Sequence, residues 1–315
     1  MNYCVIGPGA MGCLFAGYLT RAGCDTILLD YKPERVSIIS NQGLVIEEIS
    51  GTQSTIPVTV TSIPPARGKV GAVIICVKSY DTETAARMAA QIADTQTLVA
   101  TMQNGIGNME CLSGVLSRGH IVAGITSHGA TVLGAGKIRH AGMGDTFLGF
   151  AKKENLSNSI HSKLEQLAED FGKSGFITQI VNNINDLIWS KLIVNVGINA
   201  LTALTRLKNG ELLNNAETET LLEMAVREGL EVGRKEGINF IYENPLAQVK
   251  KVSQLTARNI SSMLQDVLKK KKTEIDFING AIVEKGRAHG LPTPINEVLT
   301  RLVRGLQATY DLQVC

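Results

Sequence analysis

Near its start the chain reads Tyr3-Cys4-Val5-Ile6-Gly7-Pro8-Gly9-Ala10-Met11-Gly12, an apolar run that leads into a Gly-x-Gly-x-x-Gly turn. The apolar run predicts a buried strand, and the apolar spacing from Leu14 to Ala22 predicts a helix after the turn. A strand, this turn and a helix together open a dinucleotide-binding domain, in which the phosphates lie at the helix N-terminus. We therefore expect residues 7–12 of the turn (Gly7, Pro8, Gly9, Ala10, Met11 and Gly12) to bind a cofactor pyrophosphate.

The next predicted strand, Thr26 to Leu29, ends at an acidic residue. Asp30 stands where a carboxylate binds the adenosine ribose hydroxyls, which favours NAD. Lys32 and Arg35 follow closely and could instead hold the 2′-phosphate of NADP. The sequence leaves both readings open.

Three further apolar runs, 71–77, 98–102 and 121–125, predict strands that are covered on both faces. Lys78 directly follows the first run, and Asn104 follows the second. Ligands of open α/β sheets bind outside the carboxyl ends of the strands, so both side chains are candidates for contacting the cofactor. For either residue, capping of a loop is an equally good explanation.

The rest of the first half predicts antiparallel strands over residues 129–150 that complete the sheet, and everything after residue 182 has a helical pattern. We expect an α/β fold with two domains. Residues 1–182 would form a Rossmann-type doubly wound sheet, and residues 183–315 an all-α domain that binds the substrate.

Residues 186–204 predict a helix that is apolar on nearly every side and is therefore buried. Lys191, Asn195 and Asn199 are four residues apart, so they form one narrow stripe on this helix. A solvent-exposed stripe is the ordinary explanation. Asn is a weak helix former, however, and buried amides and ammonium groups need partners, so we interpret the stripe as the lining of a ligand cavity.

Composition excludes several classes of protein. The 315 residues carry a formal net charge of +2, which gives no reason to expect binding to nucleic acid or to a membrane surface. The six cysteines form no Cys-x-x-Cys pair, and no secretion signal or membrane-spanning apolar run is evident. We expect a cytoplasmic enzyme that acts on a small molecule and has no metal site. The apolar faces of its helical domain could support a homodimer.

The motifs together resemble those of ketopantoate reductases from end to end. The most specific ones lie in the second half of the chain. They are Trp189-Ser-Lys191 with Asn195 and Asn199, Asn209-Gly-Glu-Leu, Asn259-Ile-Ser-Ser-Met-Leu-Gln-Asp266, and Thr273-Glu-Ile-Asp276 with Asn279-Gly280. The resemblance implies a fold like that of 6-phosphogluconate dehydrogenase and NAD(P)H-dependent reduction of 2-dehydropantoate to pantoate.

The resemblance also implies roles for single residues. Lys191 would be the general acid, and Glu274 would bind a substrate hydroxyl at the catalytic centre. The substrate would be held by the polar side chains Asn195, Asn199, Asn209, Asn259 and Ser262, while Lys78 and Asn104 would contact the cofactor. NADP(H) is the cofactor that the family implies. At the end of the second strand, where the family commonly has an Arg, this chain has Asp30, Tyr31 and Lys32, and Asp30 keeps NAD(H) open.

Two other functions fit the same layout. One is a β-hydroxyacid or 2-keto acid dehydrogenase with a different small substrate, since such enzymes also use a Lys and an Asn on a helix. The other is a nucleotide-sensing protein without activity. The presence of both Lys191 and Glu274 favours an enzyme.

Overall fold

The glycine-rich turn joins the first strand to the first helix, as predicted. Strand β1 (Tyr3–Ile6) is buried throughout, and helix α1 (Ala10–Arg21) begins directly after the turn. Gly7 adopts a φ of +101°, a conformation that favours glycine. The chain can therefore reverse from strand to helix within a few residues, which leaves the N-terminus of α1 at the carboxyl end of β1.

The computed structural model describes residues 1–116, 120–150 and 156–313. The chain divides into two compact units. The first unit comprises Met1–Gln103 and Asn108–Ile184, and the second comprises Asn104–Gly107 and Asn185–Cys315. A short internal segment thus belongs to the unit that is otherwise formed by the second half of the chain.

The first unit contains an eight-stranded sheet with the order β12-β11-β8-β7-β6-β1-β2-β5. Its strands are β1, β2 (Thr26–Leu29), β5 (Thr59–Thr61), β6 (Ala72–Ile75), β7 (Leu98–Thr101), β8 (His120–Thr126), β11 (Thr146–Phe150) and β12 (Thr178–Ile180). β1 pairs in parallel with β2 on one side and with β6 on the other, so the strand order reverses there. This arrangement confirms the predicted doubly wound α/β fold.

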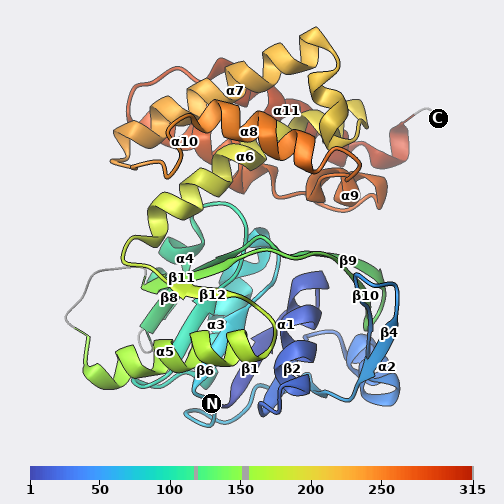
Figure 1. Ribbon diagram of the computed structural model, residues 1–315, viewed down its shortest axis with the longest axis vertical. Coiled ribbons are helices and arrows are strands. Elements are labelled where there is room, and N and C mark those ends of the chain that lie inside the picture. Colours follow the sequence, from blue (N-terminus) through green and yellow to red (C-terminus); the bar gives the residue numbers. More distant parts are fainter. Residues whose placement is uncertain (117–119, 151–155, 314–315) are drawn as a thin grey trace. The chain divides into compact units, whose positions relative to one another are not determined.

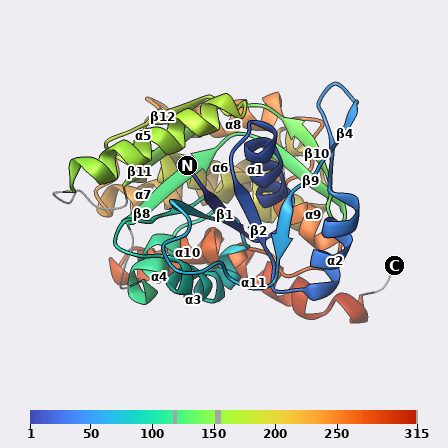
Figure 2. The same cartoon turned by 90° about the horizontal axis from the view of Figure 1, so that it is seen from below.

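Alternate residues of the central strands face two different helical layers. Tyr3 and Val5 share a core with α1 and α5, while Cys4 and Ile6 share a core with α3 and α4. Figures 1 and 2 show the sheet between these layers. The helices and 3₁₀ turn of this unit, apart from α1, are α2 (Pro33–Gln42), η1 (Ser79–Asp81), α3 (Thr82–Ile92), α4 (Asn108–Val115) and α5 (Asn158–Lys173). Coverage of both faces explains why the central strands β1, β6 and β7 are buried and mostly apolar along their whole length.

The prediction that residues 129–150 complete the main sheet is wrong for two of their three strands. β9 (Gly129–Gly134) and β10 (Lys137–Gly142) join β3 (Leu44–Glu47) and β4 (Gln53–Ile56) in a separate sheet with the order β4-β3-β10-β9. Only β11 enters the main sheet. The physical reason lies in α1, whose residues from Gly12 to Leu19 are all buried. A second apolar layer must therefore cover this helix, and the register partners Ile46 and Ile138 supply part of it.

The second unit is helical and is built around the long helix α6. Leu192, Ile193, Val196 and Ala200 of α6 lie in its core, together with side chains of α7, α8, α10 and α11. Its elements are α6 (Ile184–Thr205), η2 (Asn209–Leu213), α7 (Ala216–Lys235), α8 (Pro245–Leu255), α9 (Ser262–Leu268), η3 (Ile275–Phe277), α10 (Asn279–Ala288), α11 (Pro294–Ala308) and η4 (Tyr310–Leu312).

Helix α6 corrects the expectation that no segment is long and apolar enough to span a membrane. Its 22 residues pass that test by length and composition. However, 67% of its most apolar window is buried inside the protein, which is what the core helix of a folded unit shows. The apolar character of α6 serves the packing of the helical unit.

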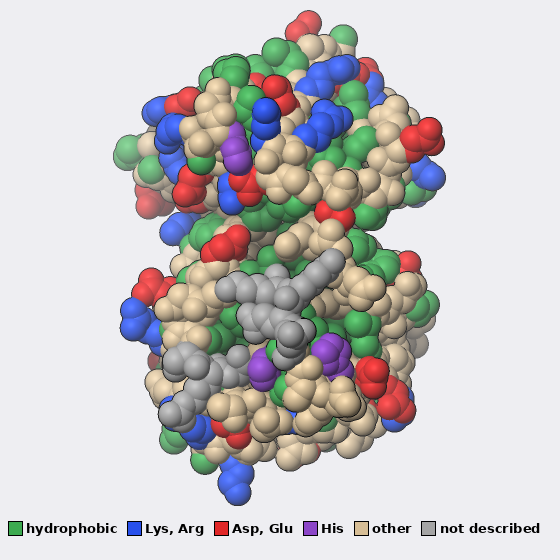
Figure 3. Space-filling view, turned by 90° about the vertical axis from the view of Figure 1, so that its left-hand side faces the viewer, with side chains coloured by type: hydrophobic (Ala, Val, Ile, Leu, Met, Phe, Trp, Pro, Cys, Tyr) green, Lys and Arg blue, Asp and Glu red, His purple; other side chains and the backbone are tan. Residues whose placement is uncertain are grey.

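The surface of the helical unit carries charges of both signs. Figure 3 shows Lys and Arg side chains interspersed with Asp and Glu side chains over the visible face of this unit. The same mixture is expected from the formal net charge of +2. No extended field of one sign arises on this face.

Candidate active site

The glycine-rich turn forms a cradle in which side chains have no room. A Cβ atom on Gly12 would lie 2.0 Å from the carbonyl oxygen of Gly7, and one on Gly7 would lie 2.6 Å from Cγ1 of Val77. Gly9 occupies the N-cap of α1 and has no side chain that could cap the helix. The first N–H groups of α1 therefore lack intrahelical partners, and Pro8, Ala10 and Met11 complete the turn around them. This geometry fits the pyrophosphate of a dinucleotide.

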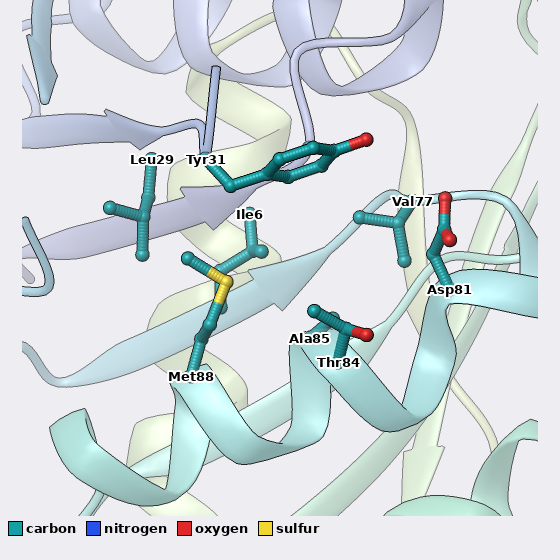
Figure 4. A pocket seen from close by; sticks show the side chains of 9 residues that line it. Ile6, Leu29, Tyr31, Val77, Asp81, Thr84, Ala85 and Met88 are labelled. Atoms are coloured by element: carbon teal, nitrogen blue, oxygen red, sulfur yellow. The ribbon is translucent and has the colours of Figure 1, made fainter. Parts of the chain in front are cut away.

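A cavity of about 220 Å³ lies beside this turn (Figure 4). It is lined by Ile6, Gly7, Leu29, Tyr31, Val77, Asp81, Thr84, Ala85 and Met88. Tyr31 lies on one side of the cavity, and Ala85 and Met88 of α3 lie on the opposite side. The cavity is mainly apolar and stands where the strand order reverses, so its shape and chemistry fit an adenine ring.

The carboxylate of Asp30 is bound within the protein. Arg35 donates from Nε to one carboxylate oxygen and from Nη2 to the other, the second bond measuring 2.6 Å. The backbone N–H of Lys32 adds a third bond of 3.2 Å. The Asp30 side chain has no exposed surface, whereas that of Arg35 is 30% exposed. The negative charge of Asp30 is thus offset by a cation that still reaches solvent.

Lys78 and Asn104 follow the carboxyl ends of β6 and β7, as predicted. Lys78 is the N-cap residue of η1 and is half-buried. Asn104 is also half-buried, and it is the first residue of the internal segment that belongs to the helical unit. The sequence placed both residues at strand ends but could not assign Asn104 to the second unit.

Gln103 and Thr82 organise the ends of these strands and were not recognised from the sequence. Nε2 of Gln103 donates to the carbonyl oxygen of Val77 over 3.0 Å and to Oγ1 of Thr82 over 2.8 Å. Thr82 Oγ1 also lies 2.9 Å from Oδ1 of Asn108, at the start of α4. The sequence offered one signal for Gln103, namely a polar side chain that follows closely after a buried strand. The network holds together the chain segments from which Lys78 and Asn104 emerge.

The predicted polar stripe lies on α6. Asn199 is only 4% exposed, and Lys191 and Asn195 are half-buried. Four-residue spacing places the three side chains on one face of this helix. Burying an amide or an ammonium group without a polar partner costs free energy, so these side chains are better suited to binding a polar ligand than to apolar packing.

Glu274 lies near Lys191 within the helical unit. It is 5% exposed and forms the N-cap of the short helix η3. Burial lowers the pKa of Lys191 to about 8, and the attraction of the Glu274 carboxylate partly offsets this effect. A lysine with such a pKa releases its proton far more readily near neutral pH than an ordinary lysine, so it can act as a general acid.

The other predicted substrate residues lie around η2 and the start of α9. Asn209 is 8% exposed, donates to Oγ1 of Thr256 over 3.0 Å, and has an Oδ1 without a partner among the described residues. Its backbone N–H binds the carbonyl oxygen of Asn259 over 3.0 Å. The side chains of Asn259 and Ser262 are exposed. These contacts bring Asn209 and Asn259 together.

Ser261, which was not predicted, connects α9 to the helix that carries the stripe. Its hydroxyl caps α9 by accepting from the N–H of Leu264 over 3.0 Å. It also accepts from Oγ1 of Thr202 on α6, over 2.7 Å. This bond holds the start of α9 against α6 at Thr202, which is three residues after Asn199 in the sequence.

Comparison with known proteins identifies the family. Residues 3–153 match the family described as Ketopantoate reductase PanE/ApbA, and residues 183–307 match its C-terminal counterpart. The 2-dehydropantoate 2-reductase of Halobacterium salinarum is 34% identical over 304 residues, which cover 96% of this chain and 98% of the relative. The enzyme of the same name from Archaeoglobus fulgidus is 33% identical, with coverage of 96% and 97%.

Solved structures agree with this assignment. A PanE/ApbA family ketopantoate reductase from Ralstonia eutropha JMP134 has a TM-score of 0.88 at 31% identity and covers 99% of this chain and all of its own. D-mandelate dehydrogenase in a ternary structure with NADH and anilino(oxo)acetate has a TM-score of 0.90 at 26% identity, again with 99% and 100% coverage. Full-length similarity in sequence and structure shows that this chain belongs to the ketopantoate reductase family, a family of nicotinamide-dependent oxidoreductases.

Proposed function

We propose that the protein reduces 2-dehydropantoate to pantoate with NAD(P)H. The observation that supports this function most directly is the pairing of the half-buried Lys191 with the buried Glu274 in the helical unit, in a chain that matches 2-dehydropantoate 2-reductases along its whole length. The glycine cradle and the apolar cavity of the first unit suit the dinucleotide.

The glycine cradle would hold a nicotinamide cofactor, which would supply a hydride to the keto carbon of the substrate. The former carbonyl oxygen gains negative charge, and Lys191 donates a proton from Nζ to it, which leaves a neutral amine and a hydroxyl group. Glu274 binds a substrate hydroxyl and favours the protonated form of Lys191 before the reaction. The lysine thus begins charged and ends neutral, and solvent restores its proton.

The substrate carries a carboxylate and a hydroxyl, which need donors and acceptors. Amide side chains offer both, and hydroxyls do as well. We assign this role to five polar side chains: Asn195, Asn199, Asn209, Asn259 and Ser262. Asn209 supports the assignment, because its buried Oδ1 has no hydrogen-bond partner among the described residues.

We further propose that NADPH is the preferred cofactor. An acid selects NADH when its carboxylate is free to accept from the ribose hydroxyls. The carboxylate of Asp30 instead accepts from Arg35 and from the N–H of Lys32. The cationic side chains of Arg35 and Lys32 then leave this end of the cofactor site suited to a 2′-phosphate.

A different 2-keto acid is the second candidate substrate. It is favoured by the similarity to D-mandelate dehydrogenase, whose structure holds NADH and anilino(oxo)acetate. One experiment tests substrate and cofactor together: progress curves with 2-dehydropantoate and with phenylglyoxylate, each with NADPH and with NADH. We expect the highest kcat/KM for 2-dehydropantoate with NADPH. Turnover of phenylglyoxylate alone would favour the second candidate, and no turnover of any pair would favour a sensor without activity.

A further inference from the structure

The segment Asn104–Gly107 departs from the simple division of the chain into two halves. It follows β7 and precedes α4, both of which belong to the first unit, yet it is part of the helical unit. Its flanking residues stay in the first unit, where Gln103 and Asn108 are both within hydrogen-bond distance of Thr82 Oγ1, at 2.8 Å and 2.9 Å. The residues that flank the segment therefore belong to the first unit, and the segment itself belongs to the helical unit.

Two contacts attach this segment to the helical unit. The backbone N–H of Ile106 donates to the carbonyl oxygen of Phe277 over 3.2 Å. The side chain of Ile106 packs against the core that α6 organises. A hydrogen bond and an apolar anchor at the same residue fix the position of the segment on this unit.

Gly105 makes the attachment sterically tight. Its φ is +80°, and a Cβ atom added to it would lie 2.4 Å from the carbonyl oxygen of Phe277 and 2.9 Å from its Cβ. Backbone cannot yield as the end of a flexible side chain can. Gly105 is thus required both for its conformation and for the close approach to Phe277.

Phe277 leads directly to the catalytic pair. Its N–H donates to the carbonyl oxygen of Glu274 over 3.0 Å, within the first turn of η3. The Glu274 carboxylate in turn acts on Lys191. A continuous path of backbone hydrogen bonds therefore runs from Ile106 to the residue that is paired with Lys191.

We propose that Gly105 is a positioning residue for the reaction. Packed against the Phe277 carbonyl, it fixes the position of Asn104 within the helical unit, relative to Glu274 and Lys191 of the same unit. This inference rests on the proposed function, in which Asn104 contacts the cofactor. A displacement of about 1 Å at reacting groups can cost about 100-fold in rate. Gly105 accordingly controls kcat more than it controls cofactor affinity.

Gly105→Ala tests the proposal, with Gly107→Ala as its matched control. Gly107 also has a positive φ, +92°, but nothing lies within 4 Å of a Cβ atom added there. Both variants strain the backbone, and only Gly105→Ala pushes against Phe277. We expect kcat to fall about 100-fold in Gly105→Ala and no more than about 3-fold in Gly107→Ala, while the Kd for NADPH, measured by fluorescence titration, changes less than about 3-fold in both.

Ile106→Ala provides a second variant in case Gly105→Ala does not fold. It removes the apolar anchor and retains both the N–H and Gly105, and we expect kcat to fall about 10-fold with an unchanged Kd for NADPH. Equal kcat values for Gly105→Ala and Gly107→Ala in an active wild-type background, or an undiminished kcat in Ile106→Ala, would overturn the inference alone. A wild-type protein that turns over no 2-keto acid would overturn the proposed function, and the positioning role with it.

Discussion

Lys191 illustrates how burial changes the acidity of an ordinary side chain, which is why we propose it as the general acid. Desolvation disfavours its charged form, and the Glu274 carboxylate restores part of that loss, which leaves its pKa at about 8. A fully exposed lysine would hold its proton too tightly, and a lysine buried without a carboxylate would lose it. The two opposing effects make the proton easier to release near neutral pH, as the proposed general acid requires.

Lys191→Ala should abolish reduction and leave cofactor binding nearly intact. Loss of a general acid costs about 100- to 10,000-fold in rate, whereas the proposed dinucleotide site lies in the other unit. The measurements are kcat for 2-dehydropantoate and the Kd for NADPH, with Lys235→Ala as the control because Lys235 is an exposed lysine of the same unit. Near-normal turnover by Lys191→Ala would show that another group donates the proton.

The pH profile of reduction should report the same lysine. Because the protonated form is the acid, kcat/KM should decline as the pH rises through about 8. Glu274→Gln removes the charge that raises the pKa of Lys191, so the decline should begin at lower pH and kcat/KM should be reduced. A decline at the same pH in both proteins would argue that Glu274 does not act on Lys191.

Arg35 should influence the choice of cofactor more than Asp30 does. Arg35→Gln removes the cation proposed to face the 2′-phosphate, and we expect kcat/KM for NADPH to fall about 10-fold or more relative to NADH, as expected for loss of one charge-assisted hydrogen bond. Because this variant leaves Asp30 buried without its partner, the double variant Asp30→Asn/Arg35→Gln serves as the folding control. An unchanged ratio of NADPH to NADH activity in both variants would contradict the proposed NADPH preference.

At the scale of elements, a row of hydrogen-bonded side chains links α1 to the small sheet. The hydroxyl of Tyr18 on α1 donates to Glu48, so it must accept from Nδ1 of His140, which lies 2.9 Å away on β10. Nε2 of His140 is then bare when this imidazole is neutral, and it accepts from Nδ1 of His128 over 3.0 Å. Because the Glu48 carboxylate can only accept, it fixes which atom donates in each hydrogen bond of this row.

The two buried histidines of this hydrogen-bond network predict a loss of stability in mild acid. Burial is the main cause that lowers the pKa of His128 and of His140, so the folded protein resists protons that the unfolded chain binds near its ordinary pKa of about 6.5. Stability should be complete above about pH 6.5 and decline as the pH falls from there toward the lower folded values, by about 1.4 kcal/mol for each unit of pKa shift.

Urea unfolding at pH 7.5 and pH 5.5 measures this effect. The double variant His128→Gln/His140→Gln should be less stable at pH 7.5, but its midpoint should change less between the two pH values, because it lacks the titrating groups. If the wild type and the double variant show the same change of midpoint, the histidine pair is not the source of acid sensitivity.

The packing of α6 predicts opposite outcomes for two helical glycines. A Cβ atom at Gly197 would lie 2.8 Å from Cγ2 of Val226 on α7 and 2.9 Å from Cγ1 of Val249 on α8, whereas nothing lies within 4 Å of one at Gly305 on α11. Gly197→Ala should therefore lower the free energy of unfolding by about 1–3 kcal/mol. Gly305→Ala should raise it by about 0.5–1 kcal/mol through helix propensity. If urea unfolding gave the same free energy of unfolding for both variants, α6 would be able to shift and accept the added methyl group.

At the scale of the whole molecule, the chain forms two units with separate cores. Two apolar clusters flank the main sheet of the first unit, and a third surrounds α6 in the second unit. Periodicity alone predicted the sheet and the helical half, because continuous apolar runs and helical spacing are local properties. The small sheet was missed, since the pairing of β3 with β10 joins residues that are far apart in the sequence. No local signal reports such a partner.

The amino-acid sequence by itself determined the kind of protein: a glycine turn for a dinucleotide, a stripe of Lys191, Asn195 and Asn199, and the strand ends at Lys78 and Asn104. Each of these depends on residues close together in the chain, where spacing translates directly into geometry. Only the tertiary structure decided that Arg35 binds the carboxylate of Asp30, that burial lowers the pKa of Lys191 while Glu274 partly offsets this effect, and that Asn104 belongs to the helical unit. Lys191 and Glu274 lie far apart in the sequence, so no short stretch of sequence encodes their proximity. Asp30 and Arg35 are close in the sequence, but whether their side chains pair depends on how deeply the folded protein buries the carboxylate.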